Sequence, residues 1–307
     1  MTFAEQYVKA HKTKDLYSDQ CSKYGYTSFY SRYGWEDYIL DKSLIYSHRA
    51  NKYTKKTFTE GLHAHDYYEL IIYVDGNVNY VTDNYIVNPK PYSVIWFAPG
   101  QMHTATLLSD SQYERYVFYF LEDFFVLNNT QIPMTAFMNR QNAKVFLSDS
   151  TYKEKIESIL NKINSQLRSD DFCGGLLAKA LIIELFGILN SADMAVGSIT
   201  PSTDFCMSIK NYIDTEFASI TTMGCICEKF HYSREHISRK FKDAFNISIS
   251  DYIAKRRVLE SLPLLNEMSG SGAAYEVGFK SQSAYIAAFK KNMGCLPSEY
   301  KKHKYDK

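Results

Sequence analysis

The chain of 307 residues is longer than one ordinary hydrophobic core can organise, so at least two domains are expected. Apolar residues make up 45% of the chain, which is enough to fill two cores. No stretch has the roughly 18 uninterrupted apolar residues that a membrane span requires. The opening MTFAEQYVKAHKTKD also lacks the apolar segment of a secretory signal. We therefore expect a soluble, cytoplasmic protein.

The small net charge of +1 conceals an uneven distribution. Residues 205–307 carry 16 Lys and Arg against 11 Asp and Glu, a net charge of +5, whereas residues 1–204 carry 19 against 23, a net charge of −4. A basic balance in one part only is typical of a phosphate-binding module attached to a unit that does not bind nucleic acid.

Short β-rich runs separated by turn signals fill the segment from about Leu44 to Phe120, including YYELIIYV, VNYVT and YERYVFYF. Asp75-Gly76-Asn77 predicts a hairpin turn, because glycine accepts the positive φ that such turns need. Strands at this density, without intervening helices, predict a β-sandwich or barrel in a domain spanning residues 1–149.

From about Ser150 to Asn190 the apolar residues change to a helical period, as in Ile156, Ile159, Leu160, Ile163 and Leu167. A second apolar run begins at Gly174-Gly175, so residues 150–190 predict a helical hairpin. This hairpin either only covers the sheet or also forms a dimer interface. Residues 191–204 are poor in large apolar residues and contain Gly, Pro, Ser and Thr, which predicts a linker.

Residues 205–307 contain an internal repeat with an offset of 48. The matched pairs are Ser233 and Ser281, Phe241 and Phe289, Lys242 and Lys290, Phe245 and Met293, Asn246 and Gly294, Ser250 and Ser298, Asp251 and Glu299, and Tyr252 and Tyr300. Each copy predicts a helix capped by the first Ser and ended by Asn or Gly, and then a further helix capped by the second Ser. With the apolar run that precedes each copy, this pattern predicts an all-α domain with two helix-turn-helix units.

The second helix of each unit has an apolar stripe, formed by Ile237, Phe241 and Phe245 or by Tyr285, Phe289 and Met293. The opposite face is predicted to enter the DNA major groove, where Arg239 suits guanine, Gln282 suits adenine and Lys242 suits phosphate. For any one of these residues a merely solvated helix face is as good an interpretation, but the duplicated framework favours DNA. The predicted DNA-binding residues are Arg234, Glu235, Ser238, Arg239, Lys242, Gln282, Ser283 and Lys290.

Residues 205–304 resemble the AraC/XylS family of transcription regulators, whose signature reads here YEVGFKSQSAYIAAFKKNMGCLPSEYKK. The resemblance implies seven helices, binding to promoter DNA and, usually, recruitment of RNA polymerase. Gly270 and Gly272 stand where family members usually have Ile and Glu. Each would cost about 1 kcal/mol in a helix interior. Ala287 stands where Arg is frequent, so the second unit is expected to read bases less than the first.

Four residues of the β-rich half could hold a metal ion. His63, His65 and Glu69 share one parity, so on a single strand their side chains would point to one face. His103 follows in PGQMH. The pattern HxHxxxE followed by PGxxH resembles the cupin barrel, in which three His and one Glu can hold Fe, Mn, Ni, Zn or Cu. The glycine that usually opens the cupin motif is replaced by Thr57.

Three roles for this group remain open, namely a bound divalent metal, a pocket that hydrogen-bonds a polar small molecule, and a purely structural role. The family resemblance favours a sugar or related metabolite as effector, with Tyr67 and Tyr80 as further candidate stacking platforms. The predicted effector-binding residues are His63, His65, Glu69, Tyr73, Trp96 and His103, and the candidate metal ligands are His63, His65, Glu69 and His103.

These features predict an effector-responsive transcription regulator, a homodimer on promoter DNA with no chemistry of its own. A different class of protein, a metal-dependent cupin enzyme carrying a DNA-binding domain, is the alternative, and a regulator that senses the metal itself is a third. The sequence has no Ser-His-Asp, phosphate-loop or paired-carboxylate pattern that would indicate other catalysis.

Overall fold

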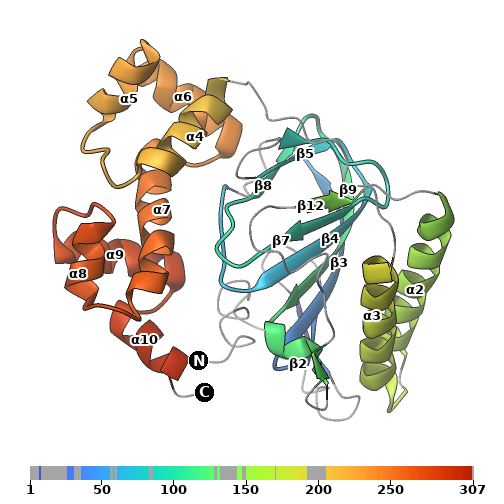
Figure 1. Cartoon of the computed structure of the whole chain (residues 1–307). Coiled ribbons are helices and arrows are strands. Elements are labelled where there is room, and N and C mark those ends of the chain that lie inside the picture. Colours follow the sequence, from blue (N-terminus) through green and yellow to red (C-terminus); the bar gives the residue numbers. More distant parts are fainter. Residues whose placement is uncertain are drawn as a thin grey trace.

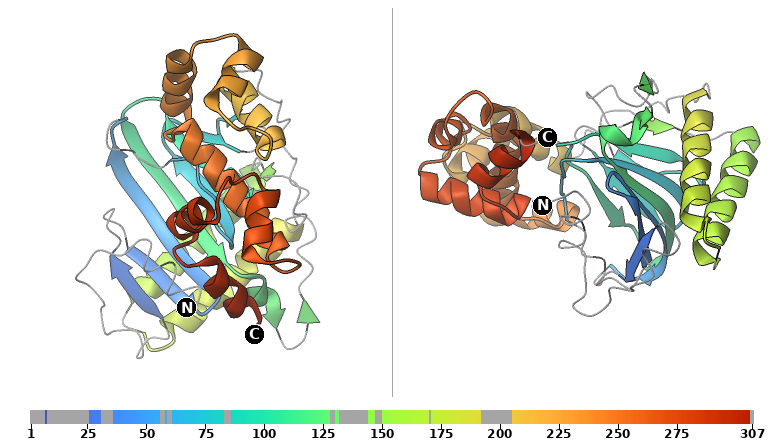
Figure 2. Two further views of the ribbon diagram at one scale, coloured as in Figure 1. Left: turned by 90° about the vertical axis from the view of Figure 1, so that its left-hand side faces the viewer. Right: turned by 90° about the horizontal axis from the view of Figure 1, so that it is seen from below.

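The computed structural model describes residues 7, 26–30, 36–55, 58, 61–82, 86–127, 130–131, 144–146, 150–169, 171–191 and 205–305. Its strands lie in the middle of the molecule, with a helical hairpin on one side and the C-terminal helices on the other (Figures 1 and 2). The predicted α+β fold, a β-rich domain followed by an all-α domain, is confirmed.

The β-rich domain has two main sheets. The strands are β1 (Thr27–Tyr30), β2 (Glu36–Asp41), β3 (Leu44–Tyr53), β4 (Tyr68–Asp75), β5 (Val78–Val81), β6 (Ile86–Val87), β7 (Val94–Phe97), β8 (Thr104–Leu107), β9 (Ser111–Phe120), β10 (Val126–Leu127), β11 (Thr130–Gln131) and β12 (Lys144–Phe146). The larger sheet has the order β1-β2-β3-β9-β4-β7-β12, the smaller has the order β6-β5-β8, and β10 pairs with β11.

Side-chain alternation gives the larger sheet two different faces. In β4, Leu70 and Ile72 face the core shared with the helical hairpin, whereas Ile71 and Tyr73 face the core between the two sheets. The second core is closed on its far side by β5 and β8, which contribute Val78, Tyr80, Ala105 and Leu107.

The prediction of a hairpin at Asp75-Gly76-Asn77 was wrong. Strand β4 pairs with β7 and β9, whereas β5 pairs with β6 and β8, so the turn carries the chain from one sheet to the other. The turn residues specified a change of direction correctly. They contained no information about strand pairing, because β4 pairs with β7 and β9, which follow later in the chain and which local turn chemistry does not specify.

The helical hairpin consists of α2 (Ser150–Arg168) and α3 (Gly174–Ser191). The five apolar residues predicted to line α2 are buried against the sheet and α3. Phe186 of α3 completes this core, with its ring 5.2 Å from that of Phe120. The predicted linker lies, from residue 192 onward, outside the residues that the structure describes.

Residues 205–305 form seven helices, the number that the family resemblance implied. These are α4 (Phe205–Glu216), α5 (Met223–Phe230), α6 (Arg234–Phe245), α7 (Ile249–Leu264), α8 (Gly270–Glu276), α9 (Gln282–Met293) and α10 (Pro297–Tyr305). Helices α5 and α6 form the first helix-turn-helix unit, α8 and α9 form the second, and α7 joins them (Figure 1).

Most of the predicted helix ends are confirmed. Ser233 and Ser281 accept hydrogen bonds from the first turns of α6 and α9, and Asn246 and Gly294 end these helices in the left-handed region. The predicted role of the second serine was wrong. Ser248, two residues before Ser250, caps α7 because its hydroxyl accepts from Asp251 N and donates to the Asp251 carboxylate.

The second unit shows the same difference at its second serine. Ser298 lies inside the first turn of α10, and the Glu299 carboxylate accepts the hydrogen bond from Leu296 N at 2.7 Å. The two unusual glycines, Gly270 and Gly272, lie in the first turn of α8, where Ser269 accepts from Gly272 N. The loss of helix stability expected for a glycine in a helix interior, about 1 kcal/mol, therefore applies only in part to Gly270 and Gly272.

The two domains share a third apolar core. Leu62, Val81 and Met102 of the β-rich domain pack with residues of α4, α6 and α7, including Met207, Phe241, Phe245 and Ile249. This contact fixes the first helix-turn-helix unit against one end of the β-rich domain. Across the described part of the chain, every helix is too short or too polar to cross a membrane.

Two glycines of the second unit give a matched test of its backbone. Gly278, between α8 and α9, has a φ of +91°, and a Cβ there would lie 2.4 Å from Ala218 O. Gly294, at the end of α9, has a φ of +72° and open space around its Cβ position. We expect Gly278→Ala to lower the free energy of unfolding by about 3 kcal/mol or more, because strain and a backbone clash add.

Gly294→Ala serves as the control, since it introduces the backbone strain without the clash, and a loss of about 1 kcal/mol is expected. Urea unfolding of both variants measures the difference. Equal losses would contradict the close approach of the α8–α9 turn to Ala218.

Candidate functional site

The structure places the predicted DNA-binding residues on the outer faces of α6 and α9. Ser238 is half-buried, and the other members are exposed, namely Arg234, Glu235, Arg239, Lys242, Gln282, Ser283 and Lys290. The stripes on the opposite faces are buried as predicted, except that Met293 is half-buried. Both helices therefore present a polar face to solvent and an apolar face to their own unit.

Helix α7 is the shared support of the two units. Its Tyr252 hydroxyl donates a hydrogen bond to Asp214 of α4, and its Ser261 hydroxyl lies 3.0 Å from the Tyr285 hydroxyl of α9. Arg257, also on α7, donates to Phe217 O at 2.8 Å and to Ile220 O at 2.6 Å. These polar contacts, together with the ring contact of Tyr252 with Phe241 of α6 at 5.5 Å, attach both units to α7, so the spacing of the outer faces of α6 and α9 is set within the domain.

The candidate metal ligands converge at one end of the core between the two sheets. His63 and His103 face each other in an isolated antiparallel bridge, with N···O distances of 2.9 and 2.8 Å. Ligand atoms of these two residues, His65 and Glu69 all lie within 4.8 Å of one another. His63, His65 and Glu69 do not share one strand, as their spacing had suggested, because the two histidines precede β4 and only Glu69 lies on it.

Backbone carbonyls hold one ring nitrogen of each histidine. His63 Nδ1 lies 2.9 Å from Gly61 O, His65 Nδ1 lies 2.8 Å from Tyr67 O, and His103 Nδ1 lies 2.9 Å from Gln101 O. Because a carbonyl oxygen can only accept, each Nδ1 must donate, which leaves the lone pair of a neutral ring on Nε2. Such carbonyl contacts are the usual outer support of metal-binding histidines.

The Glu69 carboxylate lies among these Nε2 atoms. Its Oε2 is 2.8 Å from His103 Nε2 and 3.0 Å from His65 Nε2. Two lone pairs facing a carboxylate repel it unless the rings gain a second proton or a cation lies between them. Burial favours the protonated acid, but the hydrogen bonds from His103 and His65 outweigh it and hold the pKa of Glu69 well below its usual range.

The pKa values of His63 and His65 shift downward, whereas an ion pair with the Glu69 carboxylate would raise them. Burial lowers the pKa of His65 despite the nearby Glu69 carboxylate. Burial, followed by the charges of His103 and Lys255, lowers the pKa of His63 well below its usual range. Without protons on Nε2, the three rings and the Glu69 carboxylate would offer three nitrogens and one oxygen, a donor set that fits a tetrahedral divalent cation such as Zn²⁺.

A second polar group in the same core was missed by the sequence analysis. Arg49 Nη2 donates to the Tyr7 hydroxyl at 2.8 Å and lies 3.6 Å from Asp37 Oδ1, and all three residues are buried. Burial raises the pKa of Asp37, against the opposing effect of the Arg49 charge. Arg49 follows Ile45 by four residues on β3, so both side chains point to the core between the sheets. A charged residue at such an inward position was the sequence feature that could have revealed this group.

The Tyr119 ring connects the two polar groups. Its centroid is 4.9 Å from that of Tyr7 and 6.1 Å from that of His65, and Arg49 Cζ lies 5.5 Å from it. Tyr67 stacks on His65 at 3.9 Å. The interior of the β-rich domain therefore offers charged groups, hydroxyls and aromatic faces in one continuous region.

The aromatic residues predicted at this site have different positions. Trp96 packs against Tyr68 at 5.2 Å in the core shared with the hairpin, on the opposite face of the sheet from the cluster. Its neighbour Phe97 is the residue that stacks on His103, at 3.9 Å. Tyr73 lies in the core between the sheets, where its hydroxyl donates to Gly76 O. Tyr80 is buried there too, with its hydroxyl against that of Tyr113.

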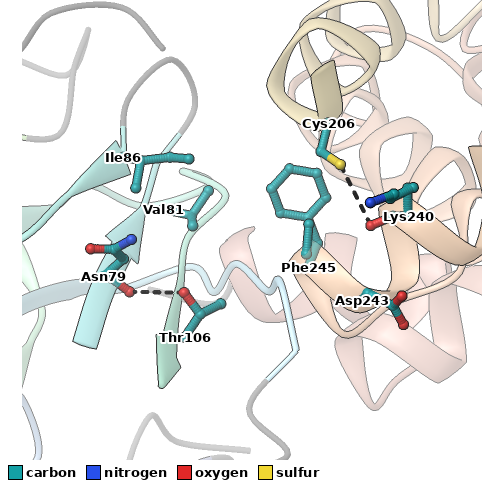
Figure 3. Close-up of a pocket in the computed structure, with 9 residues that line it drawn as sticks. Asn79, Val81, Ile86, Thr106, Cys206, Lys240, Asp243 and Phe245 are labelled. Carbon is teal, nitrogen blue, oxygen red and sulfur yellow. Dashed lines mark hydrogen bonds between the residues drawn. The ribbon is translucent and has the colours of Figure 1, made fainter. Parts of the chain in front are cut away.

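A cleft of about 370 Å³ lies between the two domains (Figure 3). Asn79, Val81, Ile86 and Thr106 line it from the β-rich domain. Cys206 of α4 and four residues of α6 line the other side, namely Lys240, Asp243, Ala244 and Phe245. The face of α6 that borders this cleft is next to the face predicted to meet DNA.

Two family models match the chain. One, described as an AraC-like ligand binding domain, matches residues 47–186, and the other, described as a helix-turn-helix domain, matches residues 226–303. The first runs from β3 to most of α3 and leaves out β1 and β2, and the second runs from within α5 to α10.

Among curated relatives, the chain is similar to the HTH-type transcriptional activator RhaR of Mannheimia succiniciproducens, at 20% identity over 248 residues, covering 78% of this chain and 86% of that protein. It is 35% identical over 80 residues to the probable transcription factor PqrA of Proteus vulgaris, covering 25% of this chain and 66% of that protein. Among solved structures, ToxT from Vibrio cholerae aligns at 18% identity and a TM-score of 0.33, covering 85% of this chain and 98% of that one.

The pKa values in the cluster predict a dependence of stability on pH. His63 and His65 bind protons less tightly when folded than in the unfolded chain, where the pKa is about 6.5. Their contribution to stability is therefore complete above that pH and is lost as the pH falls below it. Glu69, whose pKa is also lowered, contributes stability that is complete above about pH 4.3 and is lost on further acidification.

We expect the free energy of unfolding, measured in urea with a chelator present, to fall between about pH 7 and pH 5. His63→Gln removes one of the two groups and should reduce this fall. His236→Gln, on α6 and away from the cluster, is the control and should keep the wild-type slope. An unchanged slope in His63→Gln would contradict the assignment of a neutral, buried imidazole.

Proposed function

The chain belongs to the AraC/XylS family of transcription regulators, and on that premise we propose that it is a sequence-specific regulator whose DNA binding responds to a small polar metabolite, a sugar or a related compound. The observation that carries the proposal is that α6 and α9 lie in two similar helix-turn-helix units and each exposes a polar face. These units are joined to a domain with a polar interior.

The DNA-binding half of the proposal rests on charge and geometry together. Residues 205–307 carry a net charge of +5, and Arg239 and Lys242 are exposed on one face of α6. An arginine on a groove-facing helix can donate two hydrogen bonds to guanine, whereas lysine neutralises phosphate. Transcription activation through contact with RNA polymerase is part of the same proposal, and the relative RhaR is itself named a transcriptional activator.

The effector half rests on the interior of the β-rich domain. A sugar needs both donors and acceptors for its hydroxyls and a flat face for its ring. Arg49 donates, Asp37 accepts, and Tyr67 and Tyr119 offer aromatic faces between them and the histidine cluster. The proposed effector site therefore consists of His63, His65, Glu69 and His103 extended by the missed residues Arg49, Asp37 and Tyr119. Tyr73 is peripheral to it, and Trp96 lies on the other side of the sheet.

A second candidate function is metal sensing, and the cluster geometry favours it. Three Nε2 atoms whose rings are held by carbonyl contacts, together with one ionised carboxylate, are the donor set of a zinc site. A bound divalent cation would supply positive charge that compensates the buried Glu69 carboxylate. The same donor set underlies the alternative of a metal-dependent enzyme, which turnover assays on sugar and aromatic substrates would reveal.

Gel-shift titration with promoter fragments from the protein's own genome tests the DNA-binding half. The wild-type affinity should fall as the salt concentration rises, because lysine and arginine release counterions from DNA. Arg239→Ala should abolish site-specific binding, whereas Gln282→Ala should weaken it modestly, by about 1 kcal/mol. Lys162→Ala, on the exposed face of α2, is the charge-matched control and should bind as the wild type does.

The two outcomes that would contradict this proposal are distinct. A stronger effect of Gln282→Ala than of Arg239→Ala would overturn the assignment of the two helices. An absence of salt-sensitive affinity for every promoter fragment would overturn the regulator interpretation itself.

We further propose that α3 mediates a homodimer. Its exposed face has Ala180 and Gly187, and Cys173, which directly precedes the helix, continues the seven-residue spacing, with Leu176 63% and Leu177 41% exposed between them. The exposed face of α2, by contrast, is largely charged, as expected for a face that stays in water. Seven-residue spacing of small and apolar residues is typical of helices that pair with a helix of the same kind.

Analytical ultracentrifugation of the full chain tests this dimer. Ala180→Arg places a charge in the centre of the proposed interface and should yield a monomer. Ser158→Arg adds the same charge on the exposed face of α2 and should leave the dimer intact. A wild-type chain that is monomeric at high concentration, or two variants that behave alike, would contradict an interface on α3.

A further inference from the structure

The two segments that carry His63 and His103 also carry the contact with the first helix-turn-helix unit. Leu62 and Met102, which directly precede these histidines, are 1% and 0% exposed. Both lie in the core shared between the domains, together with Phe241 and Phe245 of α6. A displacement of either histidine along its backbone therefore displaces a side chain that packs against α6.

The backbone contact is equally close. Leu62 N donates to Phe245 O at 3.1 Å, at the C-terminal end of α6. A Cβ placed on Gly61 would lie 3.0 Å from the carbonyl oxygen of Asn246, the residue that ends the helix. The segment 61–63 therefore has almost no free space against the end of the helix predicted to recognise DNA. Figure 3 shows Phe245 and Val81 on the two sides of the adjoining cleft.

Helices α7 and α10 also face this loop with charged or titratable groups. Lys255 of α7 is among the charges that lower the pKa of His63, and burial lowers the pKa of Lys255 itself to about 8. Burial and then the charge of Asp66 raise the pKa of Tyr300 on α10 to about 12. The groups that face His63 are thus His65, Glu69 and His103 within the β-rich domain and Lys255 from the DNA-binding domain.

We propose that a divalent cation held by His63, His65, Glu69 and His103 loosens the docking of the first helix-turn-helix unit on residues 61–63 and 102, and so raises the affinity for DNA. Zinc–nitrogen bonds of about 2.0–2.1 Å in a tetrahedral site place the ligand atoms about 3.4 Å apart, whereas the present separations range from 2.8 Å, between His103 Nε2 and Glu69 Oε2, to at most 4.8 Å. A cation would therefore change the spacing of the ligands, and with it the positions of Leu62 and Met102, which directly precede two of the ligands and pack in the core shared with α6. The added positive charge also repels Lys255.

This inference rests on the proposed function, because it assigns a regulatory role to the same cluster. If the cation favours the released form, linkage requires DNA to raise the affinity for the cation by the same factor. Coupling between two sites in one protein is typically about 5- to 150-fold, and a change of about tenfold is expected here.

The experiment uses the full chain, stripped of metal with EDTA, and Zn²⁺ alone as the probe. Fluorescence anisotropy with a bound promoter fragment should show an affinity about tenfold higher with stoichiometric zinc than without it. Competition with a chelating dye should show zinc held about tenfold more tightly when DNA is present. Glu69→Gln, measured in parallel, corrects for zinc bound by groups outside the cluster.

Leu62→Ala separates docking from cation binding. It removes the side chain that packs on α6 and leaves all four ligands, so zinc should still bind with the same stoichiometry. The metal-free variant should bind DNA as tightly as zinc-loaded wild type, and zinc should add little. Leu40→Ala, the same truncation on β2 in the core shared with the hairpin, is the control and should keep the wild-type response.

Gly61→Ala provides a second variant in case Leu62→Ala fails to fold. Its added methyl group presses on Asn246 O without removing any packed atom, so it too should raise the metal-free affinity for DNA. The inference is overturned if zinc does not bind stoichiometrically, if zinc binds without changing the DNA affinity, or if both variants respond as the wild type does. A wild-type chain without salt-sensitive DNA binding would instead overturn the proposed function.

Discussion

Side chains alternate between the two faces of β4, β7 and β9, and this alternation separates the apolar core from the polar groups of the candidate site. It turns Leu70, Trp96 and Phe118 toward the helical hairpin, and it turns Glu69, Phe97 and Tyr119 toward the smaller sheet. The first face is apolar and gains stability by burial. The second collects the charged groups, so the polar groups of the candidate site are confined to the space between the sheets.

Repeated local patterns made the DNA-binding half predictable, and distant contacts limited the β-rich half. The apolar stripes of α6 and α9, the caps at Ser233 and Ser281 and the helix ends at Asn246 and Gly294 are local features, which sequence spacing determines directly. The motif of histidines and Glu69 also brought the right residues together, although two of them precede the strand. Trp96 was predicted at the candidate site but lies on the other face of the sheet. Composition identifies a strand, but it does not specify which of the two faces a given residue occupies.

The contact between domains was the part that no local pattern indicated. Leu62 and Met102 are single apolar residues in loops, where most such residues have no special role. Their significance depends on Phe241 and Phe245, which lie more than a hundred residues further along the chain and were assigned only to the interior of their own unit. Similarly, Arg49 became notable only once Asp37 and Tyr7 were found beside it.

The position of the cluster explains why one loop can serve both domains. The hydrogen bonds of Glu69 with His103 and His65 favour its ionised form at a buried position, so the stability of residues 61–69 depends on the protons or the cation that the cluster holds. The same loop has a fixed fit to the end of α6, where Leu62 N donates to Phe245 O. One short segment therefore contributes ligands to the polar cluster on one side and contacts the end of α6 on the other. On the proposed mechanism, a cation that moves this segment at the cluster also moves it at its contact with the first helix-turn-helix unit.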